Sequence, residues 1–159
     1  MKLEHLNRMI KSNYLQSSPF GFIMIIQHRS GCRISEVLKV SWRDIVNESE
    51  IIVHCDKGSL PKRVYVPEMS AFLPRFKKYM INPFEGVSRF QMYRLYRRLG
   101  ISVENGPNKK KSVTHAFRKE YAQSTYDTSN SIEITRDILG HKNTTSTNHY
   151  VKRKKANSR

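Results

Sequence analysis

The stretch that decides the fold is residues 18–38, which read SPFGFIMIIQHRSGCRISEVL. Ser18 followed by Pro19 is a typical helix start, because a serine side chain caps free N–H groups and proline fits the first helical position. The residues that follow are apolar on most faces, which predicts a buried helix. Gly31 is placed to end this helix, and helical spacing resumes over residues 34–40. We therefore expect two consecutive helices joined by a glycine turn.

The segments on either side extend this pattern. Apolar residues recur at helical spacing over 3–15. A β-branched run at 51–53, a polar turn and an alternating segment at 63–66 predict a β-hairpin with a long turn. Residues 69–80 are again helical in pattern, with an interruption expected at Pro74.

The second half of the chain is mostly helical in pattern. Ser88 is placed to cap a strongly basic helix over 89–99, which Gly100 ends, and residues 104–112 read as a polar loop. Further helices are expected over 114–126, 131–139 and 144–151. The predicted fold class is therefore α+β and mainly helical, with helices around a small antiparallel sheet. We expect a single domain over 1–159, of which 152–159 form a basic tail.

Charge and apolar content restrict the partners. The chain has 159 residues, with 29 Lys and Arg against 13 Asp and Glu, and a net charge of +16. Such a field favours a polyanionic partner, which includes both nucleic acid and the ribosome. The longest apolar stretch, 20–26, is too short to cross a membrane, and the amino terminus lacks a signal-peptide pattern. Cys32 and Cys55 suggest neither a disulfide scaffold nor a metal site, so we expect a cytoplasmic protein with reduced thiols.

Four short segments of the sequence stand out together. They are residues 31–36 (GCRISE), Lys57 on the hairpin, residues 115–118 (HAFR), and residues 139–141 (LGH) with Tyr150 nine positions later. In order and spacing these segments resemble the catalytic boxes of tyrosine recombinases of the phage integrase type. The resemblance extends from about residue 19 to residue 150. Several motifs in the right order are far more specific than any one of them alone.

The resemblance implies a role for each matching residue. Arg33 and Arg118 would hold the scissile phosphate with paired hydrogen bonds from guanidinium groups that keep their charge. His115 would act as an acid or base beside Arg118, and His141 would donate a further hydrogen bond to the phosphate. Tyr150 would be the nucleophile that forms a 3′-phosphotyrosine intermediate. The resemblance implies no metal and no other cofactor.

Two further residues keep alternatives open. In the family a hairpin lysine protonates the leaving 5′ oxygen, and Lys57 stands where that lysine is expected. The turn is about two residues longer than usual in the family, so Lys62 is a second candidate. Either lysine could instead contact the DNA backbone. Glu36 would orient the catalytic arginine or histidine, or else be an ordinary exposed helix glutamate.

The resemblance also implies partners. Double-stranded DNA would lie along basic residues outside the boxes, namely Arg89, Arg94, Arg97, Lys109, Lys110 and Lys111. We expect a homo-oligomer on DNA, with no membrane and no small-molecule substrate, encoded by a bacterium, an archaeon or a virus. We also expect the amino-terminal DNA-clamp domain of the family to be absent from this chain.

Three alternatives remain at this point. A type IB topoisomerase shares the tyrosine chemistry, although the residues around Arg33 and the LGH segment favour a recombinase. A non-catalytic DNA-binding module would bind DNA without a covalent adduct. A basic ribosome-associated protein would give Tyr150 no special role.

Overall fold

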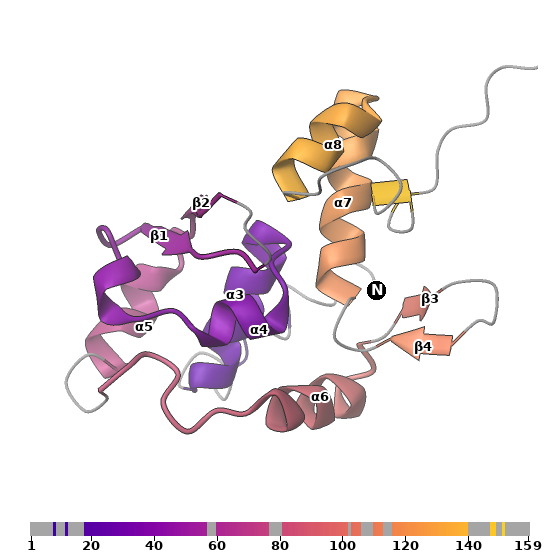
Figure 1. The fold of residues 1–159 in the computed structure, drawn as a ribbon. Helices are drawn as coiled ribbons and strands as arrows, with labels where there is room; N and C mark the ends of the chain where they lie inside the picture. Colours follow the sequence, from indigo (N-terminus) through magenta and orange to yellow (C-terminus); the bar gives the residue numbers. More distant parts are fainter. Residues whose placement is uncertain are drawn as a thin grey trace, which may run out of the picture.

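The computed structural model describes residues 8, 12, 18–56, 60–76, 81–101, 103–105, 110–112, 116–139, 147–148 and 151, with only the backbone at 75, 76, 103–105 and 110–112. Its helices and strands are labelled as in Figure 1. They are α3 (Pro19–Ser30), α4 (Ile34–Leu38), the 3₁₀ helix η1 (Trp42–Asp44), β1 (Glu50–Val53), β2 (Lys62–Tyr65), α5 (Met69–Phe76), α6 (Arg89–Arg98), β3 (Val103–Asn105), β4 (Lys110–Ser112), α7 (Ala116–Ser129) and α8 (Ile132–Leu139).

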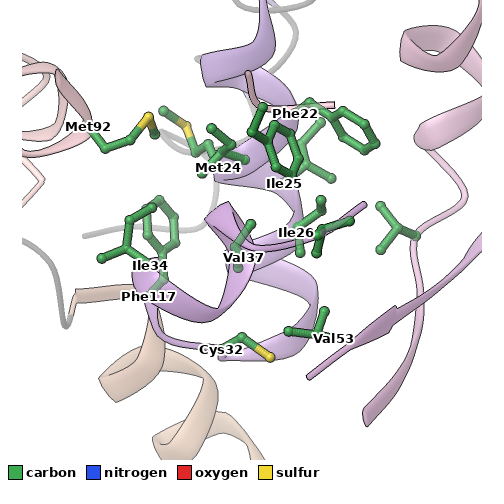
Figure 2. Close-up of a cluster of buried hydrophobic side chains, with 14 of the residues drawn as sticks. Phe22, Met24, Ile25, Ile26, Cys32, Ile34, Val37, Val53, Met92 and Phe117 are labelled. Atoms are coloured by element: carbon green, nitrogen blue, oxygen red, sulfur yellow. The ribbon is translucent and has the colours of Figure 1, made fainter. Parts of the chain in front are cut away.

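Helix α3 is the centre of the core. The Ser18 hydroxyl accepts a hydrogen bond from the Gly21 N–H at 3.3 Å, and Pro19 occupies the first helical position. The helix ends at Gly31, whose φ of 67° is a left-handed conformation that glycine adopts readily. Side chains from both sides of α3 are fully buried, and Figure 2 shows them packed against α4, β1 and α7. The two predicted helices and their glycine turn are confirmed.

The β1–β2 hairpin covers one side of α3. Its strands are antiparallel, with Ile51 opposite Val64 and Val53 opposite Lys62. Ile51, Val53 and Val64 are buried, and β2 packs on α3. The predicted hairpin is therefore confirmed, and its turn end, after Val53 and before Lys62, lies beside the α3–α4 turn.

The expected polar loop over 104–112 is wrong, because β3 and β4 pair there as a second antiparallel hairpin. The described part of the chain thus holds two separate two-stranded sheets. Two lysines in a three-residue strand have low strand propensity, so the sequence pattern gave no strand signal. Short hairpins are held by backbone hydrogen bonds, which any residue except proline can supply.

Helices α5 and α7 also differ from the prediction. Helix α5 continues through Pro74 to Phe76 instead of breaking. Pro74 removes one helical hydrogen bond, and Ser70, whose carbonyl loses that bond, is exposed to water. Helix α7 extends to Ser129, three residues beyond the predicted end. The helices expected at 3–15 and 144–151 lie mostly outside the described residues.

Helices α7 and α8 form a second unit beside α3. Figure 1 shows α8 lying along α7 on one side of the molecule, with β1, β2 and α5 on the other. Their shared apolar cluster consists of Ala122, Tyr126, Ile132, Leu139 and Val151. Helix α7 also approaches α3 closely: a Cβ added to Gly31 would lie 2.4 Å from Cδ1 of Tyr121. No helix in the described part of the chain has both the length and the apolar content needed to cross a bilayer.

A buried polar chain links α6 to the α3–α4 turn. The Tyr96 hydroxyl donates a hydrogen bond to Oε1 of Gln27, a polar residue inside the apolar helix α3. Nε2 of Gln27 in turn donates to the carbonyl oxygen of Cys32 at 3.2 Å. Because Tyr96 and Gln27 are fully buried, these bonds fix α6 relative to the turn that carries Arg33.

We predict that Tyr96→Phe lowers the free energy of unfolding by about 1–3 kcal/mol, because Oε1 of Gln27 loses its donor in a buried position. Urea denaturation measures the change. Tyr93→Phe is the matched control, since Tyr93 lies on the exposed face of the same helix. Equal stability of the two variants would contradict the buried link.

Candidate active site

Arg33 lies at the turn between α3 and α4 and is the residue that precedes the first turn of α4. Its backbone N–H donates to Oε1 of Glu36 at 2.8 Å. Its guanidinium Nη1 lies 3.8 Å from Oε2 of the same carboxylate. The Arg33 side chain is 30% exposed, so it is held at its base and can still reach an external ligand.

Glu36 joins this turn to the hairpin. Its side chain is 2% exposed, so the alternative of an ordinary exposed glutamate does not hold. Oε2 accepts a hydrogen bond from the Asp56 N–H at 2.8 Å, just beyond β1. The Asp56 carboxylate in turn accepts from Ser35 at 3.1 Å and from Lys39 at 2.9 Å. Both ends of α4 are therefore tied to the segment that follows β1.

Arg118 joins the same turn to α8. Its side chain is among the largest that the structure buries completely. Nη1 donates to the carbonyl oxygen of Gly31 at 2.9 Å, and Nη2 donates to the carbonyl oxygen of Leu139 at 3.1 Å. One guanidinium thus connects α3, α7 and α8. Because the guanidinium group is planar, the directions of its two hydrogen bonds are fixed relative to each other.

Lys62 is a third cation of this region. It begins β2 opposite Val53, and its ammonium nitrogen is buried without a hydrogen bond to any described residue. Burial lowers the pKa of Lys62, and the charge of Arg118 lowers it further, whereas the Glu36 carboxylate opposes the shift. Lys62 therefore lies close enough to Arg118 and Glu36 to feel both charges. A buried ammonium without a partner is costly unless an anion arrives.

The predicted site residues thus fall into two groups. The structure brings Arg33, Glu36, Arg118 and the candidate Lys62 together at the α3–α4 turn. Lys57, Lys109, His115, His141 and Tyr150 lie outside the described residues. Of Lys110 and Lys111 only the backbone, in β4, is described. Val151, which follows Tyr150, is buried against α7 and α8.

Helix α6 carries the predicted basic surface. Arg89, Arg94 and Arg97 are all exposed, whereas Met92, Leu95 and Tyr96 face the core. Ser88 caps this helix as predicted, and its hydroxyl accepts from the Gln91 N–H at 3.2 Å. Phe90 is exposed on the same helix. This helix therefore presents positive charge and aromatic surface to solvent.

The sequence missed two residues that position the site. Asp56 contributes through its backbone N–H, and no residue type identifies such a contact in advance. Gln27 had a signal, because it is the polar residue inside an otherwise apolar stretch of α3. A buried polar side chain needs a partner, so its presence there predicts a hydrogen bond in the core.

We predict that Glu36→Gln lowers the free energy of unfolding by about 1–3 kcal/mol, since an amide nitrogen would face one of two backbone N–H donors. Thermal or urea denaturation measures this loss. Glu48→Gln, which removes the same charge at an exposed position, should change stability little. A Glu36 variant as stable as the Glu48 variant would contradict the bridging role of this carboxylate.

Comparison with known proteins places this arrangement in a family. The sequence profile of the Phage integrase family matches residues 2–157. The structure is similar to that of the XerA recombinase, with a TM-score of 0.67 and 21% identity, covering 94% of this chain and 58% of that one. It is also similar to the XerH site-specific recombinase in a post-cleavage complex with palindromic difH substrate (TM-score 0.70, 15% identity, 96% and 47% covered).

A third similar structure is that of a lambda integrase tetramer bound to a Holliday junction, with a TM-score of 0.64 and 18% identity. There the matched region covers 96% of this chain and 47% of the integrase. This chain therefore spans about half the length of these solved relatives. No curated protein sequence matches it.

Proposed function

The chain belongs to the phage integrase family, and we propose that it is a recombinase that cleaves and rejoins DNA strands at a specific site through Tyr150. The observation that carries the proposal is that Arg33 lies beside the Glu36 carboxylate and that the buried Lys62 feels the charges of both Glu36 and Arg118. This arrangement leaves a positive site that suits a phosphodiester. The solved relatives bound to difH substrate and to a Holliday junction support DNA as the partner.

The arginines would bind the scissile phosphate. Negative charge grows on its non-bridging oxygens in the transition state, and donors already fixed in place stabilise that charge most effectively. Glu36 holds Arg33 at its backbone, and two carbonyl oxygens hold Arg118. Because both residues are positioned before substrate arrives, little reorganisation accompanies the reaction.

Tyr150 would supply the nucleophile. Its phenolic oxygen attacks phosphorus, the bond from phosphorus to the 5′ oxygen breaks, and a 3′-phosphotyrosine remains. His115 would accept the phenolic proton, and His141 would donate a hydrogen bond to the phosphate. Val151 packs on α7 and α8, which Arg118 joins to the α3–α4 turn, and this packing supports a place for the nucleophile near the two arginines.

The leaving 5′ oxygen would take a proton from a hairpin lysine. Lys62 is favoured among the described residues, because its ammonium is buried beside Arg118 without a hydrogen-bond partner there. A lysine with a lowered pKa is a better acid near neutral pH than an exposed one. Lys57 remains the alternative that the family pattern suggests.

The partners that we propose follow from the same reaction. DNA would also contact the exposed arginines of α6, and exchange of strands between two DNA sites requires several copies of the chain. The tetramer of lambda integrase on a Holliday junction supports such an assembly. We place the activity in the cytoplasm of a bacterium or archaeon, or in a cell that carries the gene on viral DNA.

We predict that Tyr150→Phe abolishes covalent attachment to a nicked DNA substrate that carries the target site, while DNA affinity changes less than about threefold, since the phenol contributes no charge to binding. Denaturing gel electrophoresis detects the adduct, and peptide mass mapping locates it. Tyr65→Phe is the control, because Tyr65 is exposed on β2. An adduct that persists in the Tyr150 variant would exclude this residue as the nucleophile.

We predict that Lys62→Ala slows cleavage by about 100-fold or more, the usual contribution of a general acid. A 5′-bridging phosphorothioate should restore the rate, because its sulfur leaves without a proton. In the unaltered chain, the cleavage rate should fall as the pH rises, because the general acid must be protonated. Since burial lowers the pKa of Lys62, this fall should begin at a lower pH than it would for an ordinary lysine. Rescue of Lys57→Ala in place of Lys62→Ala would assign the acid to Lys57.

A further inference from the structure

Two thiols lie beside Arg33 and take no part in the proposed cleavage. Cys32 immediately precedes Arg33, and Cys55 immediately precedes Asp56. The Glu36 carboxylate accepts the N–H of Arg33 and the N–H of Asp56, each at 2.8 Å. One buried carboxylate therefore holds the backbones that follow the two cysteines next to each other.

The side chains of these cysteines meet in the same place. Figure 2 shows the Cys32 side chain in the core, directed toward Val53 of β1. The Cys55 sulfur lies 3.8 Å from the Val53 carbonyl oxygen, and Cys32 and Cys55 lie close enough for each to change the pKa of the other. Both cysteines are unbridged, and Cys55 is only half-buried, so a small reagent can reach the pair through Cys55.

The surroundings make one of the sulfurs nucleophilic. The hydrogen bond from Cys55 lowers the pKa of Cys32 to about 7 against the opposing effect of burial, and the positive charge of Lys62 acts in the same direction. The pKa of Cys55 is raised, chiefly by its hydrogen bond to Cys32. The pair therefore releases its first proton near neutral pH and retains the second. Thiolates, and not thiols, attack disulfides.

We propose that Cys32 and Cys55 form a site of reversible oxidation by low-molecular-weight disulfides, and that the resulting internal disulfide suppresses DNA cleavage. The Cys32 thiolate takes the proton of Cys55, and the half-buried Cys55 thiolate so formed attacks the external disulfide and releases one small thiolate. That small thiolate takes the proton from Cys32, and the Cys32 thiolate then attacks the Cys55 sulfur in the mixed disulfide and releases the second small thiol. The protein loses two electrons and two protons, and both small thiols carry them away.

Suppression follows from the geometry and rests on the proposed function. A disulfide bond is about 2.05 Å long, well below the separation of two hydrogen-bonded sulfurs. Its formation pulls the α3–α4 turn toward the end of β1 and displaces Arg33, which adjoins Cys32. A displacement of about 1 Å in a catalytic group can slow a reaction by about 100-fold.

The disulfide is tested without DNA. The folded chain is incubated with glutathione disulfide, and peptides are mapped by mass spectrometry without reduction. We expect a peptide that links Cys32 to Cys55 and disappears with dithiothreitol. The matched control moves the thiol by one position, with His54→Cys in a Cys55→Ser chain, because the His54 side chain is exposed and contacts Asp44. Separate glutathione adducts, or equal linkage in the control, would overturn the proposal.

Suppression is tested on the nicked DNA substrate. The oxidised chain should cleave at least about 10-fold more slowly than the reduced chain and recover with dithiothreitol, whereas Cys55→Ser should be indifferent to the oxidant. Undiminished cleavage by the linked chain would overturn suppression. A reduced chain that never cleaves DNA would contradict both the proposed function and its suppression. The peptide map would still show whether Cys32 and Cys55 form a disulfide.

Discussion

The buried guanidinium of Arg118 is the interaction on which the rest of the site depends. A charge taken out of water is expensive unless it is hydrogen-bonded, and the Gly31 and Leu139 carbonyl oxygens supply two of those bonds. Because these carbonyls end α3 and α8, one side chain fixes three helices relative to one another. Gly31 makes the approach possible, since any side chain there would meet Tyr121 of α7. The geometry proposed to bind phosphate and the helix packing thus have the same cause.

Glu36 plays the complementary role on the hairpin side. Its carboxylate neutralises part of the charge of Arg33 and fixes the chain beyond β1. The Asp56 carboxylate also acts on Arg33, yet the three cations Arg33, Lys62 and Arg118 outnumber these two anions. The described site therefore keeps an excess of positive charge in a partly dry environment. Such a site gains most when a phosphate diester enters, because electrostatic attraction is stronger where water is excluded. The same excess of positive charge would stabilise both the bound phosphate and the transition state.

Much of this arrangement was predictable from local sequence rules. The serine cap, the proline at the helix start and the glycine turn predicted α3 and α4, and alternation predicted the β1–β2 hairpin. The pairing of β3 with β4 was not predictable, because backbone bonds hold it without a side-chain pattern. Motif order assigned Arg33 and Arg118 to one site. Burial of Lys62, the bridge from Glu36 to Asp56 and the contact between Cys32 and Cys55 arise from tertiary packing, which no short motif encodes.

The most direct test of this account is a structure of the chain bound to DNA that is nicked beside the cleavage site. The account predicts that Arg118 keeps its bonds to Gly31 and Leu139, and that its guanidinium and that of Arg33 both lie within hydrogen-bond distance of the phosphate bonded to Tyr150. A complex in which that phosphate lies on another face of the protein, away from the two guanidinium groups, would contradict the account.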